Sequence, residues 1–255
     1  MGFSAEWLAL REPADHAARD PALLARAAQA AGTQPVIVDL GCGSGSTRRA
    51  FGDRLPPGTL WRMVDADPAL LALAGGEAHQ LDLNRIDALP LAGATLVTAS
   101  ALIDLVSAAW LEALVARLVA LRLPFYAALC YDGVMRWTPA LSEDADVTLA
   151  FNRHQRGDKG FGPALGPEAA EHAAGLLRAA GHQVHLAPSP WRLGPAEAAL
   201  HRALLPGIAA AAGEAGAATA GAWQAARLDR LDKTRGEIGH WDLLSLPPDM
   251  GATGG

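Results

Sequence analysis

The sequence predicts an α/β fold built on a doubly wound, mostly parallel sheet, because short strand-like runs alternate with helical segments along most of the chain. Residues 36–40 form a β-branched apolar run typical of a buried parallel strand, and a glycine-rich turn and a helix-like segment follow it at once. Residues 107–119 carry apolar side chains on one helical face, at positions 110, 111, 114, 115, 118 and 119. No internal repeat or linker interrupts the pattern, so we expect one domain over 1–255.

Turn and capping residues define the other elements. The pairs Asp-Pro at 20–21 and Gly-Pro at 166–167 predict helix starts. An alanine-rich helical region spans 195–232, where Pro206 predicts a kink or a break. The expected strands are 35–40, 60–65, 77–82, 94–99, 124–131, 182–187 and 237–246.

The turn after the first strand reads Asp39-Leu-Gly41-Cys-Gly43-Ser-Gly45. Glycines suit a turn where backbone must approach a ligand, and a helix that follows aims its N–H groups at that ligand. A dinucleotide fingerprint needs a third glycine where this chain has Ser46, and a phosphate-binding P-loop needs a lysine that is absent here. An α/β turn without a ligand is the remaining alternative.

Two further acids follow in order. Asp65 ends the second strand twenty residues after Gly45, and a strand-end carboxylate at that distance can accept two hydrogen bonds from a ribose diol. Asp67-Pro68 instead reads as a helix cap and first helical residue. Asp82 follows the third strand. It is either a ligand-binding acid or an ordinary acid of a surface loop, and the sequence favours neither.

With these three motifs in order, residues 35–135 resemble the class I S-adenosylmethionine (SAM) methyltransferases. The resemblance implies a seven-stranded sheet with 237–246 as an antiparallel last strand, and SAM as the methyl donor. It divides the chain into an N-terminal helical cap (1–34), a SAM-binding core (35–135) and an acceptor-side region (136–255) with a helical insert at 195–232.

The resemblance also assigns roles to residues. Asp39 would orient the turn or the methionine amine, Asp65 would bind the ribose, and Asp82 the adenine amino group. The expected cofactor-binding set is Asp39, Gly41, Gly43, Gly45, Asp65, Ala66, Asp82, Leu83 and Ser100. Trp7 and Arg11 are candidates to wall this pocket, and packing is the alternative for Trp7.

The acceptor side carries less specific signals. The fourth strand ends Ala-Ser-Ala-Leu at 99–102, whereas family members that methylate nucleobase amines carry Asn/Asp-Pro-Pro-aromatic there, so base-amine transfer is disfavoured. Asp104, Asp132 and His240 are the candidate general bases, with a cap, a loop acid or a packed histidine as the alternatives. The sequence does not distinguish whether the atom that accepts the methyl group is oxygen, nitrogen, sulfur or carbon.

Residues 151–163 form the densest cluster of polar side chains and glycines. We interpret the segment as a long loop that acts as an acceptor-binding lid. The segment has more basic than acidic side chains, which favours an anionic acceptor. An equally good interpretation is a solvated loop whose charges serve solubility. The candidate acceptor-binding residues are Arg153, His154, Arg156 and Lys159.

Composition limits the function classes. The net charge is −6 and the arginines are scattered, which argues against nucleic acid as a partner. No apolar run reaches the roughly 18 residues of a spanning helix, and the first residues show neither a secretory signal nor a myristoylation site. Two cysteines, Cys42 and Cys130, predict reduced buried thiols and a cytoplasmic setting, and no Cys/His cluster has zinc spacing.

These observations predict a cytoplasmic SAM-dependent methyltransferase that acts on a small molecule. The alternatives are an RNA or protein methyltransferase, and a SAM-binding protein without transfer activity. An NAD-binding enzyme is the least favoured, because Ser46 replaces the glycine that it needs.

Overall fold

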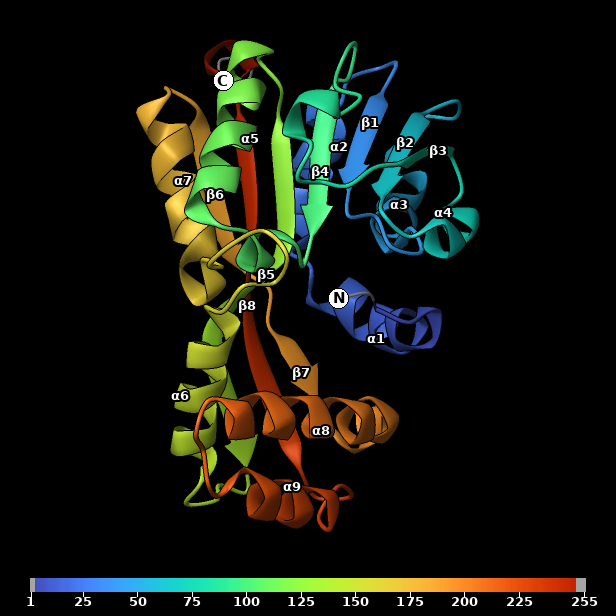
Figure 1. The fold of residues 1–255 in the computed structure, drawn as a ribbon. Helices are drawn as coiled ribbons and strands as arrows, with labels where there is room; N and C mark the ends of the chain where they lie inside the picture. Colours follow the sequence, from blue (N-terminus) through green and yellow to red (C-terminus); the bar gives the residue numbers. More distant parts are fainter. Residues whose placement is uncertain (1–2, 251–255) are drawn as a thin grey trace.

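The structure is a computed structural model that describes residues 3–250, and it divides into a sheet-based lobe and a smaller helical lobe joined by two long strands (Figure 1). The strands are β1 (Val36–Leu40), β2 (Leu60–Asp65), β3 (Glu77–Gln80), β4 (Leu96–Ser100), β5 (Phe125–Thr138), β6 (Gln183–Pro188), β7 (Trp191–Leu193) and β8 (Arg235–Leu246). The helices are α1 (Ala5–Ala18), α2 (Pro21–Ala30), α3 (Ser46–Phe51), α4 (Pro68–Ala74), α5 (Ala108–Ala120), α6 (Asp144–Gln155), α7 (Ala169–Ala179), α8 (Ala198–Glu214) and α9 (Ala220–Leu228).

The strands form one sheet in the order β3-β2-β1-β4-β5-β8-β6. Neighbours from β3 to β5 pair in parallel, and β8 runs antiparallel to both β5 and β6. This arrangement confirms the predicted doubly wound sheet with an antiparallel last strand. The short strand β7, which pairs with β8, was not predicted. Three residues are too few to produce a recognisable periodic pattern.

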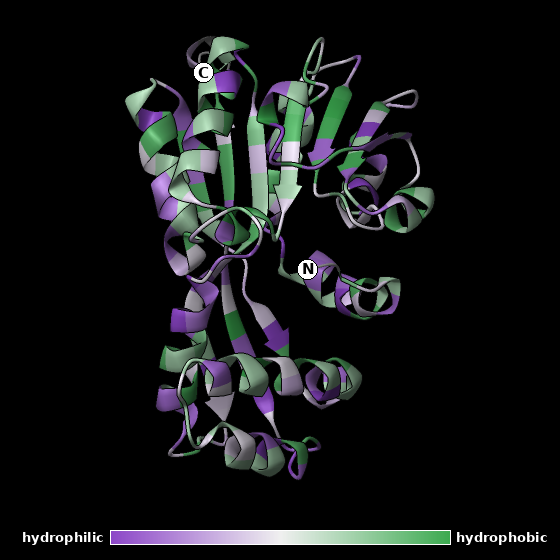
Figure 2. Cartoon of the chain, viewed as in Figure 1, coloured by the Kyte–Doolittle hydropathy of each residue, from purple (hydrophilic) through white to green (hydrophobic). Residues whose placement is uncertain are grey.

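Two apolar layers hold the sheet between helices. One layer packs α5 and α7 against one face, and the other packs α2, α3 and α4 against the opposite face. Figure 2 shows hydrophobic residues along most of β1 and β4, as expected for parallel strands that are covered on both sides. The predicted apolar stripe of α5 is confirmed by the burial of Trp110, Leu111, Leu114, Val115 and Leu118.

The helical lobe forms because β5 and β8 continue beyond the sheet as an antiparallel ribbon that carries α6, α8 and α9 (Figure 1). The fifth strand is longer than the predicted 124–131, because it continues through a bulge to Thr138. The register shifts between Tyr131 and Met135, and the Val134 N–H donates to Asp132 Oδ1 at 2.8 Å.

Two further expectations were wrong in part. Residues 151–155 belong to α6, because Val147 and Ala150 bury one face of this helix in the core of the helical lobe, so the predicted loop begins only at Arg156. Helix α8 continues through Pro206 without a break, and the alanine-rich region divides instead at 215–219.

Within residues 3–250, no helix is both long and apolar enough to cross a membrane. The same residues contain no cluster of three or more His, Cys, Asp or Glu side chains arranged to hold a metal ion. The expectations about a signal sequence and a lipid site depend in part on Met1 and Gly2, which lie outside the described residues.

Candidate functional site

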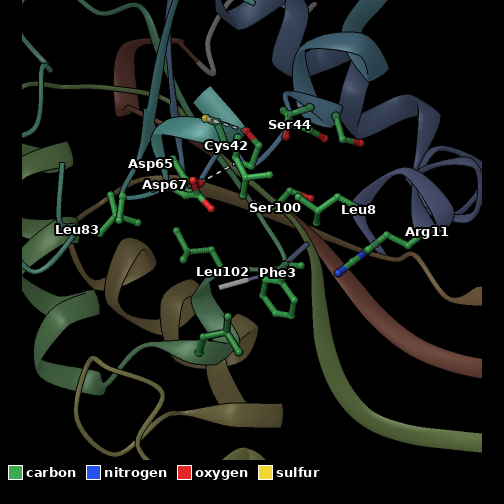
Figure 3. Close-up of a pocket in the computed structure, with 18 of the residues that line it drawn as sticks. Phe3, Leu8, Arg11, Cys42, Ser44, Asp65, Asp67, Leu83, Ser100 and Leu102 are labelled. Atoms are coloured by element: carbon green, nitrogen blue, oxygen red, sulfur yellow. Dashed lines mark hydrogen bonds between the residues drawn. The ribbon is translucent and has the colours of Figure 1, made fainter. Parts of the chain in front are cut away.

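A cavity of about 440 Å³ opens at the carboxyl ends of β1, β2 and β4, the edge where parallel α/β sheets bind ligands (Figure 3). The glycine-rich turn forms one wall, and α1, which lies against this turn, contributes Leu8 and Arg11 to the lining. We call this space the donor cavity. Its lining includes seven of the nine predicted cofactor-binding residues: Gly41, Gly43, Asp65, Ala66, Asp82, Leu83 and Ser100.

Asp65 joins two walls of the donor cavity. Its Oδ2 atom accepts a hydrogen bond from the Gly43 N–H at 2.9 Å, and its Oδ1 atom accepts one from the Asp67 N–H at 3.0 Å. A carboxylate has about four acceptor sites, so these bonds leave capacity for a ligand. Asp67 caps α4 by accepting from the Ala69 N–H at 2.8 Å, which confirms its predicted capping role.

One part of the donor cavity has an apolar lining. Leu70 and Leu83 are buried there, and Phe161 approaches from the loop that follows α6. Asp82 lies at the rim, where its Oδ1 atom accepts from both the backbone and the side chain of Asn84. An apolar slot with an acid at its edge suits a planar heterocycle that carries an amino group.

A buried positive charge that the sequence did not indicate lies behind Ser100, outside the residues that line the cavity. Arg19 is 4% exposed, and its Nη2 atom donates to Ser100 Oγ at 2.9 Å. Its Nε and Nη1 atoms have no hydrogen-bond partner among the described residues. No motif marks Arg19 in the sequence, since it precedes the Asp20 cap of α2 as an ordinary residue between two helices.

Asp39 and Gly45 support the donor cavity from outside its lining. Asp39 is fully buried, accepts from Thr98 Oγ1 at 2.7 Å, and has a pKa raised to about 7 because burial disfavours its charged form. Gly45 holds a left-handed conformation (φ 85°) against Ala74, where a Cβ would overlap the Ala74 carbonyl oxygen. Gly45 therefore shapes the turn, Asp39 joins β1 to β4, and neither residue lines the cavity.

A second cavity of about 400 Å³ lies between the lobes, and we call it the acceptor-side cavity. It shares Phe3, Arg11, Ala101 and Leu105 with the donor cavity, so the two spaces meet beside the end of β4. Its walls are mostly aromatic and aliphatic side chains from α1, β5, α6, β7, α8 and β8.

Two of the three candidate general bases, Asp104 and His240, line the acceptor-side cavity. Asp104 is buried, its Oδ1 atom has no partner among the described residues, and desolvation raises its pKa to about 6. His240 packs between the rings of Tyr131 and Trp191, and burial lowers its pKa to about 3. Near neutral pH, His240 is therefore uncharged.

The remaining predicted site residues lie elsewhere. Asp132 sits in the β5 bulge and lines neither cavity. Arg153 donates to the Ala215 carbonyl at 3.0 Å, His154 pairs with Glu214, and Arg156 pairs with Glu168, and none of the three lines either cavity. Lys159 lines the donor cavity, so the loop after α6 covers the donor side rather than the acceptor side.

No family model and no curated protein matches the sequence. Solved structures do resemble the fold. A structure described as a candidate type II methyltransferase from Anaeromyxobacter dehalogenans superposes with a TM-score of 0.53 at 17% identity, over 89% of this chain and 95% of that one. The cyclopropane synthase MmaA2 from Mycobacterium tuberculosis superposes with a TM-score of 0.50 at 12% identity, over 95% and 94% of the two chains.

The fold is that of the class I methyltransferases. Within a methyltransferase fold, the glycine-rich turn, the acid that ends β2 and the residues after β4 meet at one edge of the sheet, which is where the donor cavity lies. The identities are too low to transfer a substrate from either structure.

Proposed function

We propose that the protein is a SAM-dependent methyltransferase that acts on a small molecule. The observation that supports this most is the junction of the two cavities beside Ala101 and Leu105. One cavity has the polar groups that a nucleoside and an amino acid need, and the other is an apolar space of small-molecule size. A methyl donor and an acceptor would therefore meet at the end of β4.

Each part of SAM has a candidate partner in the donor cavity. Asp65 would accept hydrogen bonds from the ribose hydroxyls, and Leu70 and Leu83 would contact the adenine near Asp82. The amino-acid end of SAM would lie toward α1 and Ser100, whose hydroxyl oxygen accepts a hydrogen bond from Arg19 outside the cavity lining.

When bound, SAM supplies an electrophilic methyl group on a positively charged sulfur. The chain has to align an acceptor atom with that methyl group and to exclude water. Leu102, Leu105 and Phe3 provide an apolar lining at the junction of the cavities. Asp104 lies beside this junction and would take the proton of an acceptor hydroxyl or amine, because its pKa of about 6 is close to neutral pH.

The alternatives fit the structure less well. A protein that only senses SAM has no need for a second cavity at the reacting end of the donor site. An RNA methyltransferase needs a basic surface, and the two arginines of the basic segment 153–159, Arg153 and Arg156, are engaged with groups of the same chain. The proposed cytoplasmic setting rests on Cys42 and Cys130, which are both free and buried.

Calorimetric titration of the purified protein with SAM, S-adenosylhomocysteine and NAD tests the donor site. We expect both adenosyl compounds to bind and NAD to give no heat above dilution. If neither adenosyl compound binds, the proposed function is wrong. If NAD binds in their place, the site belongs to a dinucleotide enzyme.

A further inference from the structure

We infer that the acceptor-side cavity selects an uncharged or cationic apolar molecule that presents one hydrogen-bond-donating group, an N–H or an O–H, to Asp104. This inference rests on the proposed function, because it describes the acceptor that would react there. It replaces the anionic acceptor that the basic side chains of residues 153–159 suggested.

The walls of the cavity determine the body of the acceptor. Most of the lining is apolar, and aromatic rings come from both lobes. Burial of an apolar ligand against such walls supplies binding energy, whereas a strongly hydrated ligand would lose its water without replacement. The apolar lining side chains include Phe3, Trp7, Leu129, Phe151, Leu204 and Ile238.

Most polar side chains of the cavity are already engaged within the protein. Arg11 donates two hydrogen bonds to Asp15, at 2.9 and 3.1 Å, and its guanidinium stacks on the Trp191 ring. The Trp191 Nε1 atom donates to the same carboxylate at 2.9 Å. Tyr131 donates its hydroxyl hydrogen to Asn152 Oδ1 at 2.7 Å. These groups hold the walls in place.

Two fully buried polar atoms of the lining residues have no partner among the described residues: Asp104 Oδ1 and His240 Nδ1. Buried polar atoms are nearly always hydrogen-bonded, so an incompletely paired carboxylate on a residue that lines a cavity indicates a group that a ligand completes. A carboxylate oxygen only accepts, so the ligand has to donate. Asp104 lies between Ala101 and Leu105, which line both cavities, so this donating group would sit next to the donor site.

The charges that face the cavity disfavour an anion. Arg11 and Asp15 compensate each other, and His240 is neutral near pH 7. The remaining ionisable acid, Asp104, is either neutral or negative. Arg153 and Arg156, the candidate partners of an anionic acceptor, bind the Ala215 carbonyl and the Glu168 carboxylate instead. Lys159 lines the donor cavity.

Four naphthalene derivatives test the inference, since they share one apolar ring and differ in one group. The probes are 2-(1-naphthyl)ethylamine, 2-(1-naphthyl)ethanol, 1-naphthaleneacetate and 1-ethylnaphthalene, titrated calorimetrically into protein saturated with S-adenosylhomocysteine. We expect the amine and the alcohol to bind at least about tenfold more tightly than the acetate and the hydrocarbon, as a hydrogen bond to a charged group requires. If the acetate binds as tightly as the amine, or if no probe binds, the inference is overturned.

Substitutions test whether Asp104 causes the preference for probes that donate a hydrogen bond. Asp104→Leu, which removes the acceptor oxygens, should remove the advantage of the amine over the hydrocarbon, whereas Asp53→Leu, which changes an exposed acid outside the cavity lining, should keep it. Leu204→Trp should fill the cavity and abolish binding of all four probes. An unchanged order of affinities in Asp104→Leu overturns the inference. Binding of S-adenosylhomocysteine is measured first in each protein, and its absence in the wild type contradicts the proposed function rather than this inference.

Discussion

The Asp65 carboxylate accepts a hydrogen bond from the backbone N–H of Gly43, with 2.9 Å between Oδ2 and N. This bond ties the end of β2 to the glycine-rich turn after β1, across 22 residues of sequence. The acid proposed to hold the ribose therefore also holds the turn in shape. The two features that define the donor cavity act as one unit.

Asp65→Ala should weaken SAM binding by about one to two orders of magnitude, because a hydrogen bond to a charged group contributes about 1.5–3 kcal/mol. Asp65→Asn keeps an acceptor oxygen and should lose less. Calorimetric titration of the two variants with SAM measures both effects, with circular dichroism to confirm that they fold. An unchanged affinity in Asp65→Ala removes this residue from the site.

Gly45→Ala should destabilise the protein far more than Gly58→Ala. Both glycines have positive φ angles, 85° and 87°, so both variants carry the backbone strain of a left-handed alanine, about 1–2 kcal/mol. A Cβ at Gly45 would also overlap the Ala74 backbone, whereas a Cβ at Gly58 meets no atom within 4 Å. Urea unfolding gives the comparison, and equal losses in the two variants would contradict the packing described for the turn.

Asp39→Asn should change how stability depends on pH. The pKa of Asp39 is raised from 3.8 to about 7 in the folded protein, so the folded state binds this proton more tightly than the unfolded chain. Its contribution to stability is fully present below about pH 4 and is lost as the pH rises through about 7.

Between pH 5 and pH 8, the wild type should therefore lose about 1–3 kcal/mol more stability than Asp39→Asn, since one pKa unit corresponds to about 1.4 kcal/mol. Urea unfolding at the two pH values measures the difference. Other ionisable groups are common to both proteins and cancel. Parallel pH profiles would show that the raised pKa is wrong.

Asp144→Ala should unfold the helical lobe more easily. Arg227 is 1% exposed and donates from Nη2 to both carboxylate oxygens of Asp144, which also accepts from Trp223 Nε1 at 2.8 Å. Removing one partner of a buried ion pair costs about 3–5 kcal/mol, because the other charge is left uncompensated. Arg136→Ala, which breaks an exposed pair with Glu237, is the matched control and should cost less than about 1 kcal/mol. Similar losses in both variants would contradict this account.

Local chemistry made much of the fold predictable. The strand runs, the Asp20 and Asp67 caps and the apolar face of α5 all depend on neighbouring residues, so the sequence pattern contained them. The same holds for Gly43 and Asp65, whose position at the ends of successive parallel strands places them at one edge of the sheet.

The acceptor side could not be predicted in this way. Its cavity combines α1, β5, α6, β7, α8 and β8, which are distant in the sequence and meet only through tertiary packing. The basic residues of α6 looked like a binding cluster, but the helix directs Arg153 and His154 to Ala215 and Glu214. The sequence shows which side chains are charged, but it does not show which groups they contact in the folded protein.

The sequence by itself determined the α/β fold, the glycine-rich turn and the acid at the end of β2, because short-range periodicity and turn chemistry encode them. Only the tertiary structure decided that Arg19 lies buried beside Ser100 and that Asp104 and His240 face an apolar cavity, while Asp132 does not. Burial and hydrogen-bond partners depend on elements that are far apart in the chain. The function of a single acid or histidine follows from those surroundings and not from its position in the sequence.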